Sequence, residues 1–310
     1  MFDIVGKRKW YFLISAVVIG LGLLAMAVSL IRHGSPVRLS VDFTGGAMLE
    51  VRFEEPIEPE EVRGMFLDRG YSDTSVQTTA DERTALIRSK PLESEEKEAV
   101  KSALRERFGP LEELRFESVG PTIGQEVARA ASTAVLAASV AILGFVWFAF
   151  RRVPNSFRYG TCAILAMFHD ILVATGFFAI MGLVFAWEVD ALFLTAILTV
   201  LGFSVQDTIV VFDRIRENIP NRRGEAFETV VNRSILETIH RSLATQLNAI
   251  FVMIAILLFG GATIKQFIAT MLVGMLSGTY SSIFTAVPLL VVWERGEVGR
   301  LWRRLRGAMA

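Results

Sequence analysis

Residues 190–212 have the sequence DALFLTAILTVLGFSVQDTIVVF, an apolar stretch that begins with Asp190 and carries a second carboxylate, Asp207, well inside it. A hydrocarbon core of roughly 30 Å is crossed by about 20 helical residues, because each residue rises about 1.5 Å. The stretch is therefore long enough to span a membrane. Asp207 precedes Arg214 by seven residues, which places it about 10 Å inside one end of that span.

Five further stretches meet the same length criterion. The six predicted spans are about 10–31, 130–150, 159–185, 190–212, 243–260 and 267–293. Of the 310 residues, 52% are apolar and they gather in these runs, which excludes a disordered chain. The single cysteine, Cys162, excludes a disulfide scaffold and a cysteine-based metal site.

The charged residues are balanced overall but segregated along the chain. Lys+Arg and Asp+Glu each number 32, yet residues 32–126 hold 20 acidic and 13 basic side chains. The remaining basic residues lie in short clusters between the apolar runs. A nucleic-acid-binding protein would gather them on a folded polar surface, so we expect no nucleic-acid partner.

These basic clusters predict the orientation, because Lys and Arg are retained on the cytoplasmic side. The clusters comprise Lys7, Arg8, Lys9, Arg151, Arg152, Arg158, Arg214, Arg216, Arg222, Arg223, Arg233, Arg295, Arg300, Arg303, Arg304 and Arg306. The opposite loops contain Glu188, Asp190 and a single Lys265. We therefore expect a multi-pass protein with both termini in the cytoplasm and residues 32–126 outside.

The first span has an alternative interpretation as a cleaved secretory signal. Ala25-Met26-Ala27 resembles a cleavage site after a basic start. The apolar run continues to Ile31, however, and is longer than the usual 7–15 residues of a signal. Length favours an uncleaved anchor, so we assign residues 1–31 to a cytoplasmic start and the first span.

Residues 32–126 predict an α+β domain of ferredoxin-like order, β-α-β-β-α-β. Its expected elements are a strand over 49–53, a helix from Pro59 to Gly70, short strands near 74–79 and 83–88, a helix capped by Ser94 that ends at Gly109, and a strand around 114–116.

The rest of the chain forms the predicted membrane domain, 127–293, and a basic cytoplasmic tail, 294–310. Within the membrane domain, Phe227, Val231, Ile235 and Ile239 place an apolar stripe on a basic segment. This pattern predicts an amphipathic helix near 221–241 that lies along the membrane surface.

Ionisable groups inside a span are costly and indicate function by default. Asp207 is the strongest case, with Ser204 about one helical turn away and Thr208 beside it. The alternative is a structural carboxylate locked to an arginine for packing. Arg241, at the start of the fifth span, is a candidate partner, although hydropathy alone indicates an ordinary cytoplasmic anchor.

A second anomaly is His169-Asp170, which lies near the middle of the third span. It fits either a proton relay or a polar pair satisfied by hydrogen bonds between helices. Gly274 and Gly278 form a GxxxG pattern, which favours close helix packing. The nucleophile, zinc-protease and phosphate-loop motifs are absent from the sequence, so we expect no enzyme, cofactor or metal.

Several passages together resemble the SecF family, the smaller subunits of bacterial SecD–SecF protein-export complexes, of the resistance–nodulation–division superfamily. One pair flanks the external domain: Asp42-Phe43-Thr44-Gly45-Gly46 near its start and Ser118-Val119-Gly120-Pro121 at its end. The others are Phe168-His169-Asp170, GFSVQDTIVVFDRIREN over 202–218 and ETIHRSLAT over 237–245.

The resemblance implies one half of a transporter in the bacterial inner membrane, which assists preprotein translocation with the proton gradient. It implies SecD as the second half, the SecYEG channel with SecA acting on it, and a translocating preprotein, with YajC and YidC as further candidate partners. In that family the carboxylate of the fourth span and the arginine opening the fifth are the coupling pair, which correspond to Asp207 and Arg241.

Two other functions remain open from the residues. One is a small-molecule or lipid exporter half of the same superfamily, in which the external domain would dock a tunnel. The other is a scaffold that stabilises a translocation channel without ion flux. The coupling ion is H⁺ or Na⁺, since one carboxylate suits either.

Overall fold

The computed structural model describes residues 3–71, 74–78, 82–151, 156–222 and 224–296. The chain divides into two compact units. The first, here called the helical unit, comprises Met1–Val37, Val135–Trp187 and Leu192–Ala310. The second, the sheet unit, comprises Arg38–Ala134 and Glu188–Ala191.

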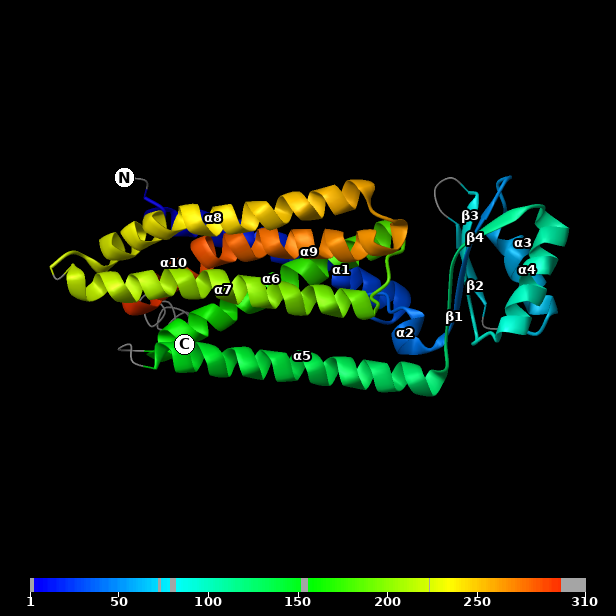
Figure 1. Cartoon of the computed structure of the whole chain (residues 1–310), viewed down its shortest axis with the longest axis horizontal. Coiled ribbons are helices and arrows are strands. Elements are labelled where there is room, and N and C mark those ends of the chain that lie inside the picture. The colour runs from blue at the N-terminus through cyan, green and yellow to red at the C-terminus, as the bar shows by residue number, and fades with distance from the viewer. Residues whose placement is uncertain (1–2, 72–73, 79–81, 152–155, 223, 297–310) are drawn as a thin grey trace, which may run out of the picture. The chain divides into compact units, whose positions relative to one another are not determined.

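Among the described residues, six helices are long and apolar enough to cross a membrane, which confirms the predicted number of spans. Their elements are η1 (Val5–Lys7) with α1 (Arg8–His33), α5 (Pro121–Phe150), α6 (Ser156–Phe185), α7 (Ala191–Asn221), α8 (Phe227–Phe259), and α9 (Ala262–Ser281) with η2 (Ser282–Ala286) and α10 (Val287–Glu294). Within the helical unit α6 packs on α1 and α9, and α8 packs on α9 (Figure 1).

Glycines set the closest helix contacts. A Cβ on Gly176 of α6 would lie 2.7 Å from the Cα of Gly22 in α1, so both positions must lack a side chain. On α9, a Cβ at Gly274 would lie 2.3 Å from Val200 Cγ2 of α7, and one at Gly278 would lie 3.2 Å from Ser204 Cβ. The GxxxG pair is thus a packing face, as predicted.

The sixth span contains a π-helical turn, η2, between α9 and α10. Pro288 lies in the first turn of α10 and has no N–H to donate to the preceding turn. A missing bond of this kind widens the helix, and π turns are frequent at functional sites. Ser281 and Ser282 lie at this turn and are completely buried.

The predicted surface helix near 221–241 is wrong. Residues Phe227–Phe259 form one continuous helix, α8. The apolar stripe therefore belongs to the N-terminal part of the helix that forms the fifth span. Val231 and Ile235 are completely buried within the protein and do not face a membrane surface. No proline or glycine interrupts the sequence between Phe227 and Phe259 to end the helix.

The sheet unit has the predicted ferredoxin-like order. It consists of α2 (Val41–Thr44), β1 (Gly46–Phe53), α3 (Pro59–Asp68), β2 (Ser75–Thr78), β3 (Thr84–Ser89), α4 (Ser94–Phe108) and β4 (Leu111–Val119). The four strands are antiparallel in the order β2-β3-β1-β4, and α3 and α4 cover one face (Figure 1). The core between them includes Val51, Phe53, Phe66, Ile87 and Leu104.

Two local expectations need correction or lie outside the structure. Glu93, not Ser94, caps α4: the Glu93 side chain accepts a bond from the helix, and its backbone N–H donates to Glu96 Oε2 at 3.0 Å. This is a reciprocal capping box with a carboxylate at the cap. Of the predicted basic clusters and tail, Arg152, Arg223 and residues 297–310 lie outside the described residues, as does the end of the strand expected at 74–79.

The Gly45-Gly46 pair turns the chain into β1. Gly45 and Gly46 have φ values of 71° and 117°, which only glycine adopts readily. A Cβ on Gly124, in the first turn of α5, would lie 2.7 Å from the backbone N of Gly45. The Gly120 carbonyl accepts the first helical bond from Gly124 N at 3.0 Å, so the Gly120-Pro121 motif starts α5.

Replacing Gly124 by alanine should destabilise this junction, because the methyl group meets backbone that cannot rotate away. We expect a loss of about 1–3 kcal/mol, the usual cost of overpacking, measured as a lower denaturation temperature in detergent. Gly144→Ala is the matched control on the same helix, since a Cβ there meets nothing within 4 Å. Equal stability of the two variants would contradict the conclusion that Gly124 must lack a side chain to pack against Gly45.

Candidate functional site

A cluster of polar side chains lies inside the helical unit, with Asp170 of α6 at its centre. Asp170 is completely buried, and both of its oxygens accept hydrogen bonds. Oδ2 accepts from Ser204 Oγ at 2.5 Å and from Ser281 Oγ at 2.7 Å, and Oδ1 accepts from Ser277 Oγ at 2.6 Å. The donors come from α7 and α9, so this one carboxylate joins three helices.

His169 extends the cluster toward α1. Its Nδ1 lies 3.0 Å from Asp170 Oδ1, and its Nε2 lies 3.0 Å from Ser15 Oγ. The imidazole stacks on the ring of Tyr280, at 6.1 Å between centroids and 21° between planes. Tyr280 donates in turn to the carbonyl of Tyr11 at 2.7 Å. The sequence motif Phe168-His169-Asp170 therefore supplies contacts between α1, α6 and α9.

Thr208 belongs to the same group of polar residues, one turn beyond Ser204. Its Oγ1 donates to the Ser204 carbonyl at 3.0 Å and lies 3.0 Å from Ser282 Oγ. Ser282 Oγ lies 2.8 Å from the carbonyl of Gly278. The hydroxyls of α7 thus meet the π turn of the sixth span, which presents Ser281 and Ser282 to the cluster.

Asp207 faces a different helix, α8. It is 6% exposed, and its Oδ2 accepts a hydrogen bond from Gln246 Nε2 at 3.0 Å. Ser242, one turn earlier on the same face of α8, is also buried. Gln246 Oε1 is a buried acceptor for which the described residues provide no donor. Asp207 and Gln246 therefore form a site with an unmet hydrogen-bond acceptor beside a carboxylate.

The structure does not bring Arg241 to Asp207. The Arg241 side chain is exposed, and among the described residues no ion pair joins it to Asp207. Ser242 and Gln246 occupy the buried face of α8. Since neighbouring helical residues differ by about 100° around the axis, Arg241 lies beside that face.

Between Asp207 and the loop that connects α7 to α8, side-chain hydrogen bonds link the two helices. Arg214 Nε donates to Glu237 Oε2 at 2.5 Å, and Asn218 Nδ2 donates to the same oxygen at 2.9 Å. Asn218 also donates to Ser234 Oγ at 3.0 Å. The two longest motifs of the sequence thus contact each other at Arg214–Glu237, and Asp207 of the first motif bonds to Gln246, the residue directly after the second.

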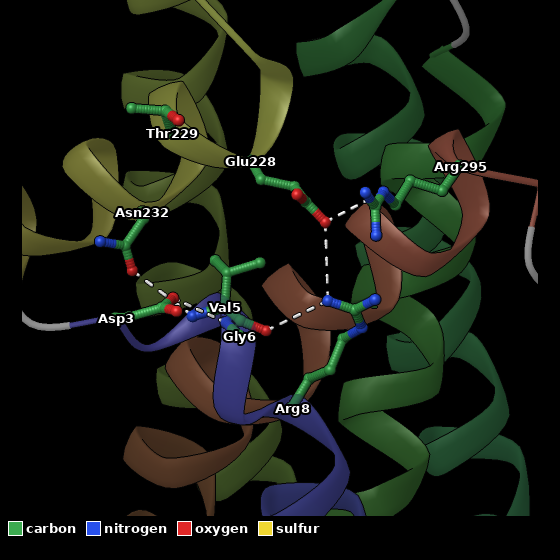
Figure 2. Close-up of a pocket in the computed structure, with 8 residues that line it drawn as sticks. All are labelled: Asp3, Val5, Gly6, Arg8, Glu228, Thr229, Asn232 and Arg295. Atoms are coloured by element: carbon green, nitrogen blue, oxygen red, sulfur yellow. Dashed lines mark hydrogen bonds and ion pairs between the residues drawn. The ribbon is translucent and has the colours of Figure 1, made fainter.

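The N-terminal segment is fixed to the same region of α8 (Figure 2). Asn232 Oδ1 accepts from the backbone N of Ile4 at 2.8 Å. Arg8 and Arg295 converge on Glu228 Oε1, at 3.6 Å and 3.0 Å. The adjacent pocket has a volume of about 360 Å³. Because Glu228 already pairs with the two guanidinium groups, we interpret this cluster as structural. It holds the beginning of the first span and the end of the sixth span against α8.

The sequence does not by itself indicate several polar residues of the site: Ser15, Gln246, Ser277, Tyr280, Ser281 and Ser282. Serine is tolerated in apolar spans and so gives little hydropathy signal. The i, i+4 spacing of Ser242–Gln246 and Ser277–Ser281 was the available signal, since such pairs share a helix face. Among the described residues no group of three or more His, Cys, Asp or Glu side chains could hold a metal ion.

The chain is similar to known families along most of its length. The model of the protein export membrane protein SecD/SecF, C-terminal, matches residues 99–296, and that of the SecD/SecF GG motif matches residues 34–57. A protein translocase subunit SecF of Thermobaculum terrenum is 46% identical, over 98% of both chains. One of Anaerolinea thermophila is 48% identical, over 98% of this chain and 96% of its own.

A solved structure agrees with these relatives. SecDF of Thermus thermophilus, described as a translocon-associated membrane protein, is 31% identical with a TM-score of 0.79. The match covers 95% of this chain and 39% of the longer SecDF chain. With the matching family models and the full-length relatives, it shows that this multi-pass membrane chain belongs to the SecD/SecF family of protein export membrane proteins.

Proposed function

We propose that the chain is a six-span subunit that assists preprotein translocation across the bacterial plasma membrane by using the proton gradient. The observation that carries this proposal is Asp207, a carboxylate buried in a membrane-spanning helix beside Gln246 Oε1, an acceptor that has no donor in the described part of the chain. Ionisable groups in such positions mark ion pathways by default. No catalytic step and no cofactor are part of the proposal.

The Asp207–Gln246 contact depends on the charge of the carboxylate. An ionised Asp207 can only accept, as it does from Gln246 Nε2. A protonated Asp207 can donate, and Gln246 Oε1 is the unmet acceptor within the same pair. Proton uptake therefore changes the bonding between α7 and α8, which is the differential interaction that a driven conformational change requires. Na⁺ remains the alternative ion, since carboxylate and amide oxygens also bind it.

Asp170 has a different role in this scheme. It accepts bonds from three serine hydroxyls and faces His169, so its oxygens are already satisfied. We assign Asp170 and His169 to packing of α1, α6, α7 and α9 and not to the proton step. Ser204 and Thr208 connect this fixed cluster to the helix that carries Asp207.

Arg241 is kept as the proposed cationic partner of Asp207. Its side chain is exposed on α8, next to the buried face that holds Ser242 and Gln246. Rotation of α8 about its axis would bring the guanidinium toward the carboxylate. We propose that the Gln246 contact and an Arg241 contact belong to two states of the transport cycle.

The proposed orientation follows from the basic clusters, with both termini in the cytoplasm and the ferredoxin-like domain outside. The proposed partners are SecD, the SecYEG channel with its motor SecA, and the preprotein, with YajC and YidC as further candidates. Exposed apolar residues along α5, which include Leu136, Val140, Phe145 and Trp147, support a second membrane half. Only 6% of the apolar window of α5 is buried within the chain.

Asp207→Asn keeps the shape and the Gln246 bond but removes the titratable group. We expect normal assembly, with loss of proton flux and of proton-dependent translocation by at least about tenfold in proteoliposomes, a fold-change equal to about 1.4 kcal/mol. Arg241→Lys should also reduce both activities, because an ammonium does not reproduce the planar guanidinium.

The matched control for that experiment is Asp213→Asn on the same helix, whose half-exposed side chain pairs locally with Arg216. It should retain flux and translocation. Full proton-driven translocation by Asp207→Asn would refute the proposed mechanism. Flux carried by Na⁺ instead of H⁺ would change the ion but retain the site.

Asp170→Ala should destabilise the bundle, since three hydroxyls and an imidazole lose their acceptor. With each hydrogen bond in a membrane worth about 0.6–1.7 kcal/mol, we expect a loss of about 2–5 kcal/mol. Unfolding in mixed detergent measures it. Asp170→Asn retains one acceptor oxygen and should keep proton flux, whereas loss of flux in a folded Asp170→Asn protein would assign Asp170 to the proton path.

Purification tests the proposed membrane partner. In mild detergent from the native membrane, the chain should elute with a second six-span protein in equal amounts. Polar substitutions of Phe145 and Trp147 on the exposed face of α5 should release that partner, whereas Leu258→Gln, on the exposed face of α8, should not. Isolation of the native chain alone would count against this arrangement.

A further inference from the structure

The short loop between α6 and α7 belongs to the sheet unit. Both helices lie mainly in the helical unit, but Glu188–Ala191 group with Arg38–Ala134. The sheet unit is therefore joined to the helical unit along the chain at this loop, as well as after α1 and within α5. Ala186 precedes the loop with φ 57°, a left-handed conformation that is uncommon for alanine and turns the chain out of α6.

The loop pairs with the segment that leads into the external domain. Val189 and Leu39 form a parallel β-bridge. Val189 N donates to the carbonyl of Arg38 at 2.7 Å, and Ser40 N donates to the carbonyl of Val189 at 2.9 Å. Both backbone groups of Val189 are used in these bonds. Backbone hydrogen bonds thus hold the loop beside residues 38–40 in the manner of a short parallel strand.

Charged side chains reinforce this pairing. Glu188 is 7% exposed and forms an ion pair with Arg88 of β3, while Arg38 Nη2 lies 3.9 Å from its other oxygen. Arg88 also donates to the carbonyl of Leu39 at 2.9 Å. On β4, Arg115 Nη2 lies 3.9 Å from Asp190 Oδ2.

The first turn of α7 is held by the family motif. Asp42 Oδ2 accepts from the backbone N of Ala191, the first residue of α7, at 3.1 Å. A carboxylate that accepts from an N–H in the first turn of a helix also interacts favourably with the positive end of that helix. Asp42 therefore connects the turn that contains Gly45-Gly46 to the same helix that carries Asp207.

We infer that Glu188–Ala191 is a permanent strap, by which movement of α7 is transmitted to the external domain. The inference rests on the proposed function, because it assumes that α7 responds to the charge of Asp207. Glu188 and Asp42 are positioning residues in this account: they touch neither the proton nor the preprotein, but they hold the beginning of α7 to the sheet unit.

The direction in which the pKa of Glu188 is shifted is consistent with permanent attachment of the strap. Burial raises the pKa of Glu188 above its ordinary value, while Arg88 and Arg38 oppose the shift and Arg115 adds a smaller opposing effect. Asp190 is the other carboxylate at the loop and faces Arg115. A raised pKa in the attached loop means that the attached state binds a proton more readily than a released loop. Acidification outside the membrane therefore favours attachment and does not release the strap.

Cysteine crosslinking tests the strap directly. In a Cys162→Ala background, Leu39→Cys with Val189→Cys should form a disulfide under mild oxidation in the assembled complex. Adding Glu188→Ala should lower the rate of crosslinking several-fold, because the loop loses its ion pairs with Arg88 and Arg38 and keeps only the backbone bonds and the contacts of Asp190 and Ala191. This readout requires no transport and stands even if Asp207 is not the proton site.

Transport measurements then test its role. Glu188→Ala should reduce translocation about tenfold while proton flux stays within about twofold, and the engineered disulfide between positions 39 and 189 should restore translocation until it is reduced. Glu113→Gln is the matched control, since Glu113 pairs with Lys97 and Lys101 in the same domain but outside the strap. Asp207→Asn, measured in parallel, reports separately on the proposed function.

Two results would overturn the inference. The first is full translocation by Glu188→Ala combined with Val189→Pro, which removes the N–H that bonds to Arg38. The second is an engineered disulfide that abolishes translocation in a chain with no other change to the strap, because the strap would then have to open during transport.

Discussion

A carboxylate inside hydrocarbon has no water to bind, so the helices around it must supply its hydrogen-bond donors. Asp170 imposes this constraint on the membrane part of the chain. Its donors come from α7 and α9, and His169 beside it reaches α1. Gly278 allows α9 to approach α7 closely, since a Cβ there would lie 3.2 Å from Ser204 Cβ. The π turn near Pro288 begins directly after Ser281, which reaches the same oxygen.

The second carboxylate, Asp207, has fewer bonds. It lies on the same helix as Ser204, but it accepts a hydrogen bond from an amide of α8, whose oxygen has no donor among the described residues. In the proposed function, one helix thus combines a fixed polar contact at Ser204 with a contact at Asp207 that changes on proton uptake. Asp42 bonds to the first residue of α7, which is the same continuous helix that carries Asp207.

Much of this architecture could be predicted from the sequence, because hydrophobic length and strand alternation are strong local signals. The six spans, the ferredoxin-like order and the packing role of Gly274 and Gly278 followed from such signals. The continuous α8 did not, since an apolar stripe on a basic helix is the same for a membrane surface and for a protein neighbour. Likewise, sequence could not show that Gln246 rather than Arg241 faces Asp207, because that depends on the rotation of α8. The loop at Glu188 was too short to indicate its partners.

The central claim is that Asp207 takes up and releases the transported proton while Asp170 stays fixed. Infrared difference spectroscopy of the reconstituted complex, with the pH changed on one side, measures this directly. The account predicts a carboxylic-acid carbonyl band that appears on acidification, vanishes in Asp207→Asn, shifts in Gln246→Leu and is unchanged in Asp213→Asn. A band that persists unaltered in Asp207→Asn would contradict it.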